Sequence, residues 1–250
     1  MLLRFSLIAL LFVWNANAYT QNLSPEEMKT EIDSKIIYYG SSVRLMNIQA
    51  KYNLHSHDLR YGGGSNQQSI TCVPSNRDDN SLWLIKSAHG ERIRHFSEPV
   101  KCGDTVRLEH TATQKNLHSH DFIAHISKKY EVSGYGEQGN GDAADDWKIL
   151  CSNQENGTTL MGSSIFDVQH VLTGRYLYTE MSHKFTQQNC GYNCQTMGFL
   201  EASADVQPSA ATKWKISSGF FFLPNASDDY LKENGDDDTS ERNPGGDELQ

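Results

Sequence analysis

The chain has 250 residues, with 22 Lys and Arg against 31 Asp and Glu, which gives a formal net charge of −9. Proteins hold a nucleic-acid backbone by displacing its counterions with Lys and Arg, so we exclude nucleic acid as a partner of this acidic chain. The charge is uneven, because residues 225–250 contain nine acids and two bases and so have a net charge of −7. The body of the chain is close to neutral.

The first 18 residues have the pattern of a signal peptide. Arg4 supplies a basic start, an apolar run extends from Leu7 to Trp14, and Ala16-Asn17-Ala18 is a small-x-small cleavage site, so we expect residues 1–18 to be removed. The apolar run is shorter than the roughly 20 residues that cross a bilayer, and no later segment approaches that length. The sequence therefore predicts entry into the secretory pathway without a membrane span.

An internal repeat dominates the body of the chain. VRLMNIQAKYNLHSHD at 43–58 matches VRLEHTATQKNLHSHD at 106–121, and the last six residues are identical in the two copies. A third and divergent copy is FDVQHVLTGRYLYTE at 166–180, in which His170 matches His110. Self-similarity at a fixed period indicates a fold built from repeated units.

Each copy is followed by a short strand that starts at a tryptophan, namely Trp83, Trp147 and Trp214. Each unit reads as about four short strands separated by Gly, Asn, Asp and Ser, although the third copy has no recognisable third strand. We expect the three tryptophans to lie in the core. Because strand residues alternate between faces, we expect Val43 to point inward and Arg44 outward.

Three such units predict an all-β fold, a single β-trefoil, in which no unit can bury its apolar face alone and the three together remove most sheet edges. A β-sandwich is the alternative, but it would not explain three copies. We assign the units to residues 34–88, 96–151 and 155–216. The acidic tail, residues 225–250, has few apolar residues and is predicted to be disordered and solvating, with weak calcium association as the alternative.

The repeated LHSH strings place His55 with His57, and His118 with His120, on one face of a strand. A chelated metal is one interpretation, but zinc ligands converge within about 2 Å of one ion, whereas equivalent positions of a trefoil are spread around its axis. The third copy also has no histidine at these positions. We therefore expect no metal and no cofactor, and we assign the four histidines a structural role in the repeat.

The five cysteines are expected to pair in an oxidising compartment, and their odd number leaves one over. The sequence predicts the disulfides Cys102–Cys151 and Cys190–Cys194, with Cys72 unpaired. The second pair closes the short loop CGYNC.

Three Asn-x-Ser/Thr sequons predict glycosylation at Asn22, Asn156 and Asn225. Pro25 follows the first sequon directly, so we expect less glycosylation at Asn22. Because a sequon needs an accessible loop, we expect Asn156 to lie in a surface turn.

No catalytic pattern is recognisable, so we expect a protein that is not an enzyme. Gly-x-Ser-x-Gly and His-Glu-x-x-His are both missing from the sequence. CGYNC is Cys-x-x-x-Cys and not the redox motif Cys-x-x-Cys, which argues against disulfide exchange. Asp145 and Asp146 are interpreted as shaping the turn before Trp147, because neighbouring strand residues point to opposite faces and could not act as an acid pair.

Several of these strings together resemble the MIR repeats of the stromal cell-derived factor 2 family. The strings are NLHSHD, KCGDTVRL (101–108), GDAADDWKILC (141–151) and WKISSGFFF (214–222). The resemblance covers about residues 34–222. It implies three MIR repeats in one β-trefoil that resides in the lumen of the endoplasmic reticulum, and it supports the Cys102–Cys151 pairing.

The resemblance also implies partners. Members of this family associate with a J-domain (Hsp40) co-chaperone of the lumen and, through it, with Hsp70; they keep misfolded clients soluble, are linked to the unfolded-protein response and are not known as enzymes. Members commonly end in an HDEL-like retrieval signal, whereas this chain has Gln250 after Asp-Glu-Leu. Because the retrieval receptor reads the terminal carboxylate, secretion is the alternative location.

Two other binding functions stay open. Trefoils often bind sugars with an aromatic ring and a nearby Asp or Asn, and the candidates for a lectin-like glycan site are Tyr61, Tyr135, Trp83, Trp147, Asp58, Asp121 and Asn140. MIR modules also occur in protein O-mannosyltransferases, so an accessory role in O-mannosylation is the other alternative, by analogy alone.

Overall fold

The computed structural model describes residues 31–33 and 35–221. Residues 1–18 and 225–250, and the sequons at Asn22 and Asn225, lie outside the described residues, so the predictions made for them stay predictions. Asn156 lies exposed in a turn, as expected for a sequon. No helix within the described ranges is long and apolar enough to span a membrane.

Short strands make up almost all of the regular structure. The first unit contains β1 (Ser42–Asn47), β2 (Asn53–Arg60), β3 (Gln68–Val73) and β4 (Trp83–Ser87). The second contains β5 (Thr105–His110), β6 (Lys115–Ile123), β7 (Tyr130–Tyr135) and β8 (Trp147–Cys151). The third contains β9 (Phe166–His170), β10 (Tyr176–Tyr178), β11 (Leu200–Glu201), β12 (Ser203–Asp205) and β13 (Trp214–Phe220).

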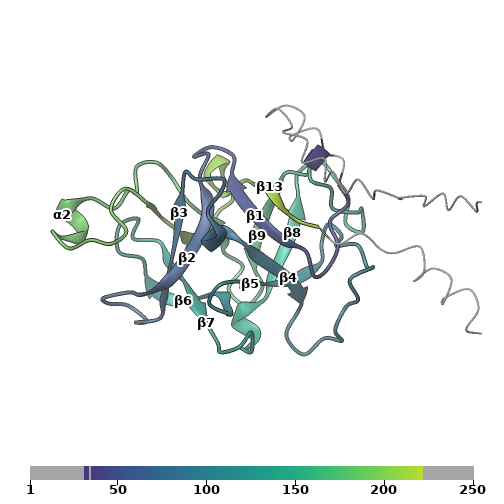
Figure 1. Cartoon of the computed structure of the whole chain (residues 1–250), viewed down its shortest axis with the longest axis horizontal. Coiled ribbons are helices and arrows are strands. Elements are labelled where there is room, and N and C mark those ends of the chain that lie inside the picture. Colours follow the sequence, from purple (N-terminus) through teal and green to yellow (C-terminus); the bar gives the residue numbers. More distant parts are fainter. Residues whose placement is uncertain (1–30, 34, 222–250) are drawn as a thin grey trace, which may run out of the picture.

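The first and last strands of the units close a barrel. β1 pairs with β4 and β13, β5 pairs with β4 and β8, and β9 pairs with β8 and β13, all of them antiparallel. The ring returns to its starting strand, so these strands present no free sheet edge to each other. Figure 1 shows β1, β4, β5, β8, β9 and β13 crossing in the middle of the molecule.

The inner strands of each unit form three hairpins that close one end of the barrel. They are β2–β3, β6–β7 and β10–β12, and the hairpins are joined to one another by the pairs β3–β7, β7–β12 and β3–β11. The short strands β11 and β12 thus supply the third strand that the third copy lacks as a sequence pattern. The prediction of an all-β trefoil is confirmed.

The three tryptophans are completely buried in the core. Each indole N–H donates to the carbonyl of a leucine in the second strand of its own unit, and the equivalent bonds are Trp83 to Leu54 at 3.1 Å, Trp147 to Leu117 at 2.8 Å and Trp214 to Leu177 at 2.9 Å. A buried donor without a partner costs about 1–3 kcal/mol, so each bond fixes the distance between two strands of a unit.

Short 3-10 helices precede the tryptophans and connect neighbouring units. They are η1 (Asp79–Ser81), η2 (Ala143–Asp145) and η3 (Ala210–Thr212). His110 Nε2 donates to the Asn80 carbonyl at 2.9 Å, and His170 Nε2 donates to the Ala144 carbonyl at 2.9 Å. In the first unit the equivalent bond comes from Asn47, whose Nδ2 donates to the Ala211 carbonyl of η3 at 2.8 Å.

Arg44 is not turned to solvent, contrary to the alternation prediction, because its side chain is mostly buried. The guanidinium donates to the Asp78 carbonyl at 3.2 Å and to an Asp79 carboxylate oxygen at 3.0 Å. These partners lie at the start of η1, far from Arg44 in sequence. An always-charged guanidinium can be buried when such partners replace its water.

The structure contains both predicted disulfides. Cys102 is bonded to Cys151, 49 residues away, and Cys190 is bonded to Cys194, 4 residues away. Cys72 is the free and fully buried cysteine of the described residues, and burial raises the pKa of its thiol to about 12.

The two disulfides should contribute unequally to stability, because a crosslink that closes a longer loop removes more conformational freedom from the unfolded chain. Replacing Cys102 and Cys151 together by Ala is expected to lower the free energy of unfolding by about 4 kcal/mol, and replacing Cys190 and Cys194 together by about 2 kcal/mol or less. Urea unfolding of the two double variants measures this difference. Equal losses would contradict the expectation.

Candidate functional site

The LHSH histidines lie on the hairpins, where they contact each other and their neighbours. His55 Nδ1 is 3.1 Å from Thr71 Oγ1, and its Nε2 is 3.5 Å from Asp78, the N-cap residue of η1. The His55 and His57 rings pack edge to face, with centroids 5.2 Å apart. These contacts of His55 all go to side chains, which connect β2 with β3 and with the start of η1.

In the second unit His118 lies against the start of η2. Its Nδ1 is 2.9 Å from Asp145 and 3.8 Å from Asp142. The three groups offer ligand atoms within 4.8 Å of one another, an arrangement that the sequence interpretation did not foresee. Asp145 already accepts hydrogen bonds from Asn116 Nδ2 and the Asp142 backbone N–H. The arrangement therefore caps η2 and links it to β6.

Asp145 and Asp146 do not lie on a strand, which corrects the premise of the sequence argument. Asp145 closes the capping box of η2 and is fully buried, while Asp146 follows it at the C-cap. Asp146 accepts a hydrogen bond from the His89 backbone N–H at 2.8 Å. Burial raises the pKa of Asp146. Both residues shape the turn that leads into Trp147.

A groove of about 560 Å³ lies where the three hairpins meet, and we call it the hairpin groove. It is lined by residues of all three units, among them Arg60, Tyr61, Ser69, Ile123, Glu131, Phe185, Cys190 and Cys194. The insert of the third unit, with the short helix α2 (Gln187–Cys190), forms one wall. In Figure 1, α2 lies at the periphery on the side of β2–β3 and β6–β7.

A second groove of about 530 Å³ lies between the β2–β3 hairpin and the start of the second unit's hairpin. We call it the Tyr135 groove. Its lining combines one aromatic ring with carboxylate, amide and cationic groups, namely Asp58, Arg60, Gln67, Gln68, Lys115, Tyr135, Glu137 and Asn140, together with Gly134, Gly136 and Gly141. Arg60 lines both grooves.

The structure brings together three of the seven residues proposed for a glycan site. Asp58, Tyr135 and Asn140 line the Tyr135 groove, and all three are exposed. Trp83 and Trp147 are buried in the core and cannot contact a ligand.

The remaining two candidates have other partners. Asp121 forms an ion pair with Arg175 at 2.9 Å, away from both grooves. The Tyr61 hydroxyl donates to the carbonyls of Ile70 and Val132, and burial raises its pKa well above the ordinary value. Tyr61 therefore joins the first two hairpins.

Comparison with known proteins agrees with this fold. The family model of the MIR domain matches residues 53–198. The chain is a MIR-domain protein with a β-trefoil fold.

Relatives of known family identify the chain more closely within the MIR-domain proteins. The chain is 39% identical to a stromal cell-derived factor 2-like protein of Dictyostelium discoideum, over 74% of this chain and 84% of that protein. It is 37% identical to stromal cell-derived factor 2 of Mus musculus, over 76% of this chain and 83% of that protein. The chain belongs to the stromal cell-derived factor 2 family.

Solved structures also resemble this one, and two of them are informative. The crystal structure of the SDF2-like protein from Arabidopsis thaliana has a TM-score of 0.69 and 34% identity, and the match covers 76% of this chain and 99% of that one. The protein O-mannosyltransferase Pmt1-Pmt2 complex of S. cerevisiae, bound to the sugar donor, has a TM-score of 0.66 and 28% identity. That match covers 81% of this chain but 29% of the other, so it concerns one part of the mannosyltransferase.

The buried histidines predict acid sensitivity. Burial lowers the pKa of His55 to about 4 and lowers those of His57, His110 and His170. Between the unfolded value of about 6.5 and these folded values the unfolded chain binds more protons, so stability falls as the pH falls through this window. His55 alone should cost about 2 kcal/mol between pH 7 and pH 5.

Urea unfolding of the native chain and of His55→Gln at pH 7 and pH 5 measures this contribution. The variant should lose less stability than the native chain on acidification. His95→Gln is the control, because it makes the same replacement at an exposed histidine. An identical pH dependence in the native chain and His55→Gln would refute the assignment.

Proposed function

We propose that this chain is a non-catalytic binding module of the endoplasmic reticulum lumen, where it associates with a J-domain co-chaperone and with Hsp70 and keeps misfolded proteins soluble. Its membership of the stromal cell-derived factor 2 family carries this proposal, because the relatives match nearly the whole described body. Both grooves are lined by side chains that suit ligand contacts. Secretion is the alternative location.

The association can be measured by crosslinking luminal extract that contains the tagged full chain, capturing the chain and identifying its partners by mass spectrometry. We expect a J-domain protein in stoichiometric amount. We also expect Hsp70, and the ratio of Hsp70 to the captured chain should fall when ATP is added. A tagged trefoil of another family is the control for adhesion. Capture of the chain alone, from an extract in which Hsp70 is present and crosslinked to other proteins, would contradict the proposal.

A second candidate function is the binding of a saccharide in the Tyr135 groove. The observation that favours it is the convergence there of Asp58, Tyr135 and Asn140, three residues that are spread over two units of the sequence. A sugar presents C–H groups to an aromatic face and hydroxyls to carboxylates and amides, and the groove offers all three kinds of group. The likeness to the sugar-donor-bound mannosyltransferase complex adds an accessory role in O-mannosylation as a related possibility.

The glycines shape this groove. Gly134 packs so closely on the Gln68 side chain that an added Cβ would lie 3.1 Å from its nearest atom. Gly136 has a φ of +87°, and a Cβ there would collide with the Asn140 backbone. The Lys115 ammonium donates to the Gly136 carbonyl at 2.6 Å. Backbone and side chain therefore hold the Tyr135 side of the groove in one conformation.

Saccharide binding predicts that Tyr135→Ala and Asp58→Asn each weaken binding of methyl α-mannoside by about tenfold, which is the effect of one lost stacking or hydrogen-bond contact. Saturation-transfer NMR with the native chain and both variants measures the effect. The control is Tyr192→Ala, because Tyr192 is 88% exposed and lies outside the groove lining.

Equal signals from the native chain and Tyr135→Ala would assign any binding to another surface. A glycan array without hits at high protein concentration would remove the saccharide function altogether.

A further inference from the structure

The Cys190–Cys194 disulfide is placed differently from the other cysteines of the described residues. Cys190 is exposed, Cys194 is half-buried, and both line the hairpin groove. Cys102, by contrast, is 1% exposed, Cys72 is fully buried and Cys151 is half-buried, so Cys190 is the one exposed cysteine of the described residues. Disulfides react when a thiolate can approach one sulfur, so exposure selects Cys190–Cys194 as the reactive bond.

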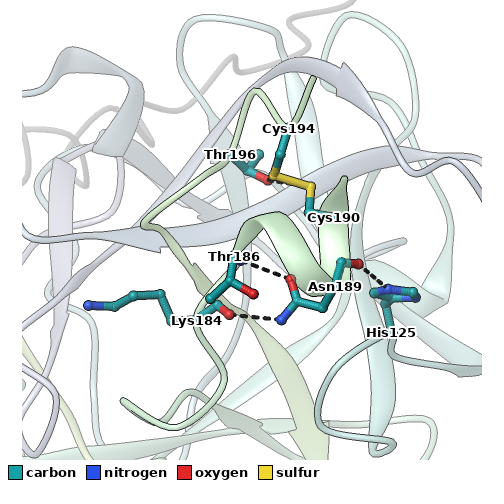
Figure 2. Close-up of a disulfide and its surroundings, with 7 residues drawn as sticks. All are labelled: His125, Lys184, Thr186, Asn189, Cys190, Cys194 and Thr196. Atoms are coloured by element: carbon teal, nitrogen blue, oxygen red, sulfur yellow. Dashed lines mark hydrogen bonds between the residues drawn. A yellow bond between two sulfur atoms is a disulfide. The ribbon is translucent and has the colours of Figure 1, made fainter. Parts of the chain in front are cut away.

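The insert stays in place through contacts that do not involve the disulfide. The capping box of α2 joins Thr186 and Asn189, and Asn189 Nδ2 donates to the Lys184 carbonyl at 3.0 Å. His125 Nε2 donates to the Asn189 carbonyl at 2.7 Å and so ties α2 to the second unit. Figure 2 shows Asn189 between these partners, with the disulfide at the end of the helix. Opening the bond would therefore leave Cys190 on a helix that these contacts hold in place.

Thr196 lies beside both sulfurs. Its Oγ1 atom is 3.6 Å from Cys194 Sγ and 3.9 Å from Cys190 Sγ, and the residue is 91% buried, with 9% of its surface exposed. A hydroxyl that donates to a thiolate stabilises it and makes that sulfur the better leaving group. The shorter distance makes Cys194 the leaving sulfur and exposed Cys190 the sulfur that is attacked.

The groove itself offers contacts to a polypeptide. Ile123 and Phe185 supply apolar surface, and Arg60 supplies a positive charge that favours an approaching thiolate. Ser69 lines the groove, and its buried hydroxyl has no hydrogen-bond partner among the described residues. Glu131 also lines the groove, and its carboxylate accepts hydrogen bonds from the Ser65 backbone and hydroxyl.

We propose that the hairpin groove captures a polypeptide with a free thiol by thiol–disulfide exchange at Cys190–Cys194. The thiolate of the bound polypeptide attacks Cys190 Sγ, a new S–S bond forms there, and the Cys190–Cys194 bond breaks with its electron pair on Cys194. The Cys194 thiolate either attacks back and releases the polypeptide unchanged or takes up a proton from water.

A second thiol of the polypeptide can also resolve the mixed disulfide. Its attack on the first polypeptide sulfur leaves Cys190 and Cys194 as thiols and the polypeptide with one new disulfide, so two electrons pass from the polypeptide to the chain. This activity goes beyond the binding functions proposed above and depends on neither of them. The sequence argument against exchange rested on the spacing of the two cysteines, whereas the groove and Thr196 are visible in the structure alone.

The test uses the oxidised full chain and reduced glutathione, a tripeptide thiol, followed by acid quenching and peptide mapping by mass spectrometry. We expect glutathione on Cys190 with Cys194 as a free thiol, while Cys102–Cys151 stays intact. A cyclised peptide of residues 189–195 is the matched control, because it has the same disulfide without Thr196 or the groove. The chain should react about tenfold faster than this peptide.

Thr196→Val removes the hydroxyl and keeps the shape of the side chain, so it should slow the exchange by about fivefold. The double variant Cys190→Ser/Cys194→Ser should take up no glutathione. The proposal is overturned if glutathione appears on Cys102 or Cys151 as fast as on Cys190, if the cyclised peptide reacts as fast as the chain, or if Thr196→Val reacts at the native rate.

Discussion

The fold depends on one hydrogen bond that occurs once in each unit, from a buried tryptophan indole to a leucine carbonyl in the second strand. The indole fills the core, but its N–H is polar and must be satisfied there. The bond therefore holds the hairpin of a unit at a fixed height above the barrel strand that carries the tryptophan. His110 packs against Trp83, and His170 packs against Trp147. Each histidine also donates to the 3-10 helix that precedes its tryptophan, so each tryptophan contacts a histidine that connects its unit to the next one.

The repeat pattern was enough to predict this architecture, since the matching tryptophans and the LHSH strings mark corresponding strands. What the pattern could not show are features that depend on distant partners. Arg44 is buried because η1 supplies acceptors for its guanidinium, and strand alternation says nothing about such a helix. The third strand of the third unit is split into β11 and β12, which contain no β-branched residue to reveal them. Their pairing with β3 and β7 defines them instead.

The candidate sites also include features that residue types predict and features that depend on partners far away in the sequence. Residue types suggested Asp58, Tyr135 and Asn140 as sugar contacts, and the structure places all three in one groove, because β3 pairs with β7 and brings two hairpins together. Tyr61 has the same residue type as Tyr135, but its hydroxyl bonds two backbone carbonyls, a use that only the three-dimensional structure reveals. The hairpin groove has no sequence signature, because its walls come from three units that are far apart in the chain.

The third unit shows how a pseudo-threefold scaffold can acquire a function in one unit alone. It has kept the tryptophan bond and the histidine link to η2, but it has lost the LHSH histidines and gained the insert with Cys190 and Cys194. The retained contacts use one side chain and a backbone carbonyl each, so they tolerate changes in the neighbouring loop. An insert at a hairpin tip faces the other two hairpins and becomes the wall of a groove that all three share. Divergence of one unit therefore creates an asymmetric binding surface without disturbing the core that the three units hold in common.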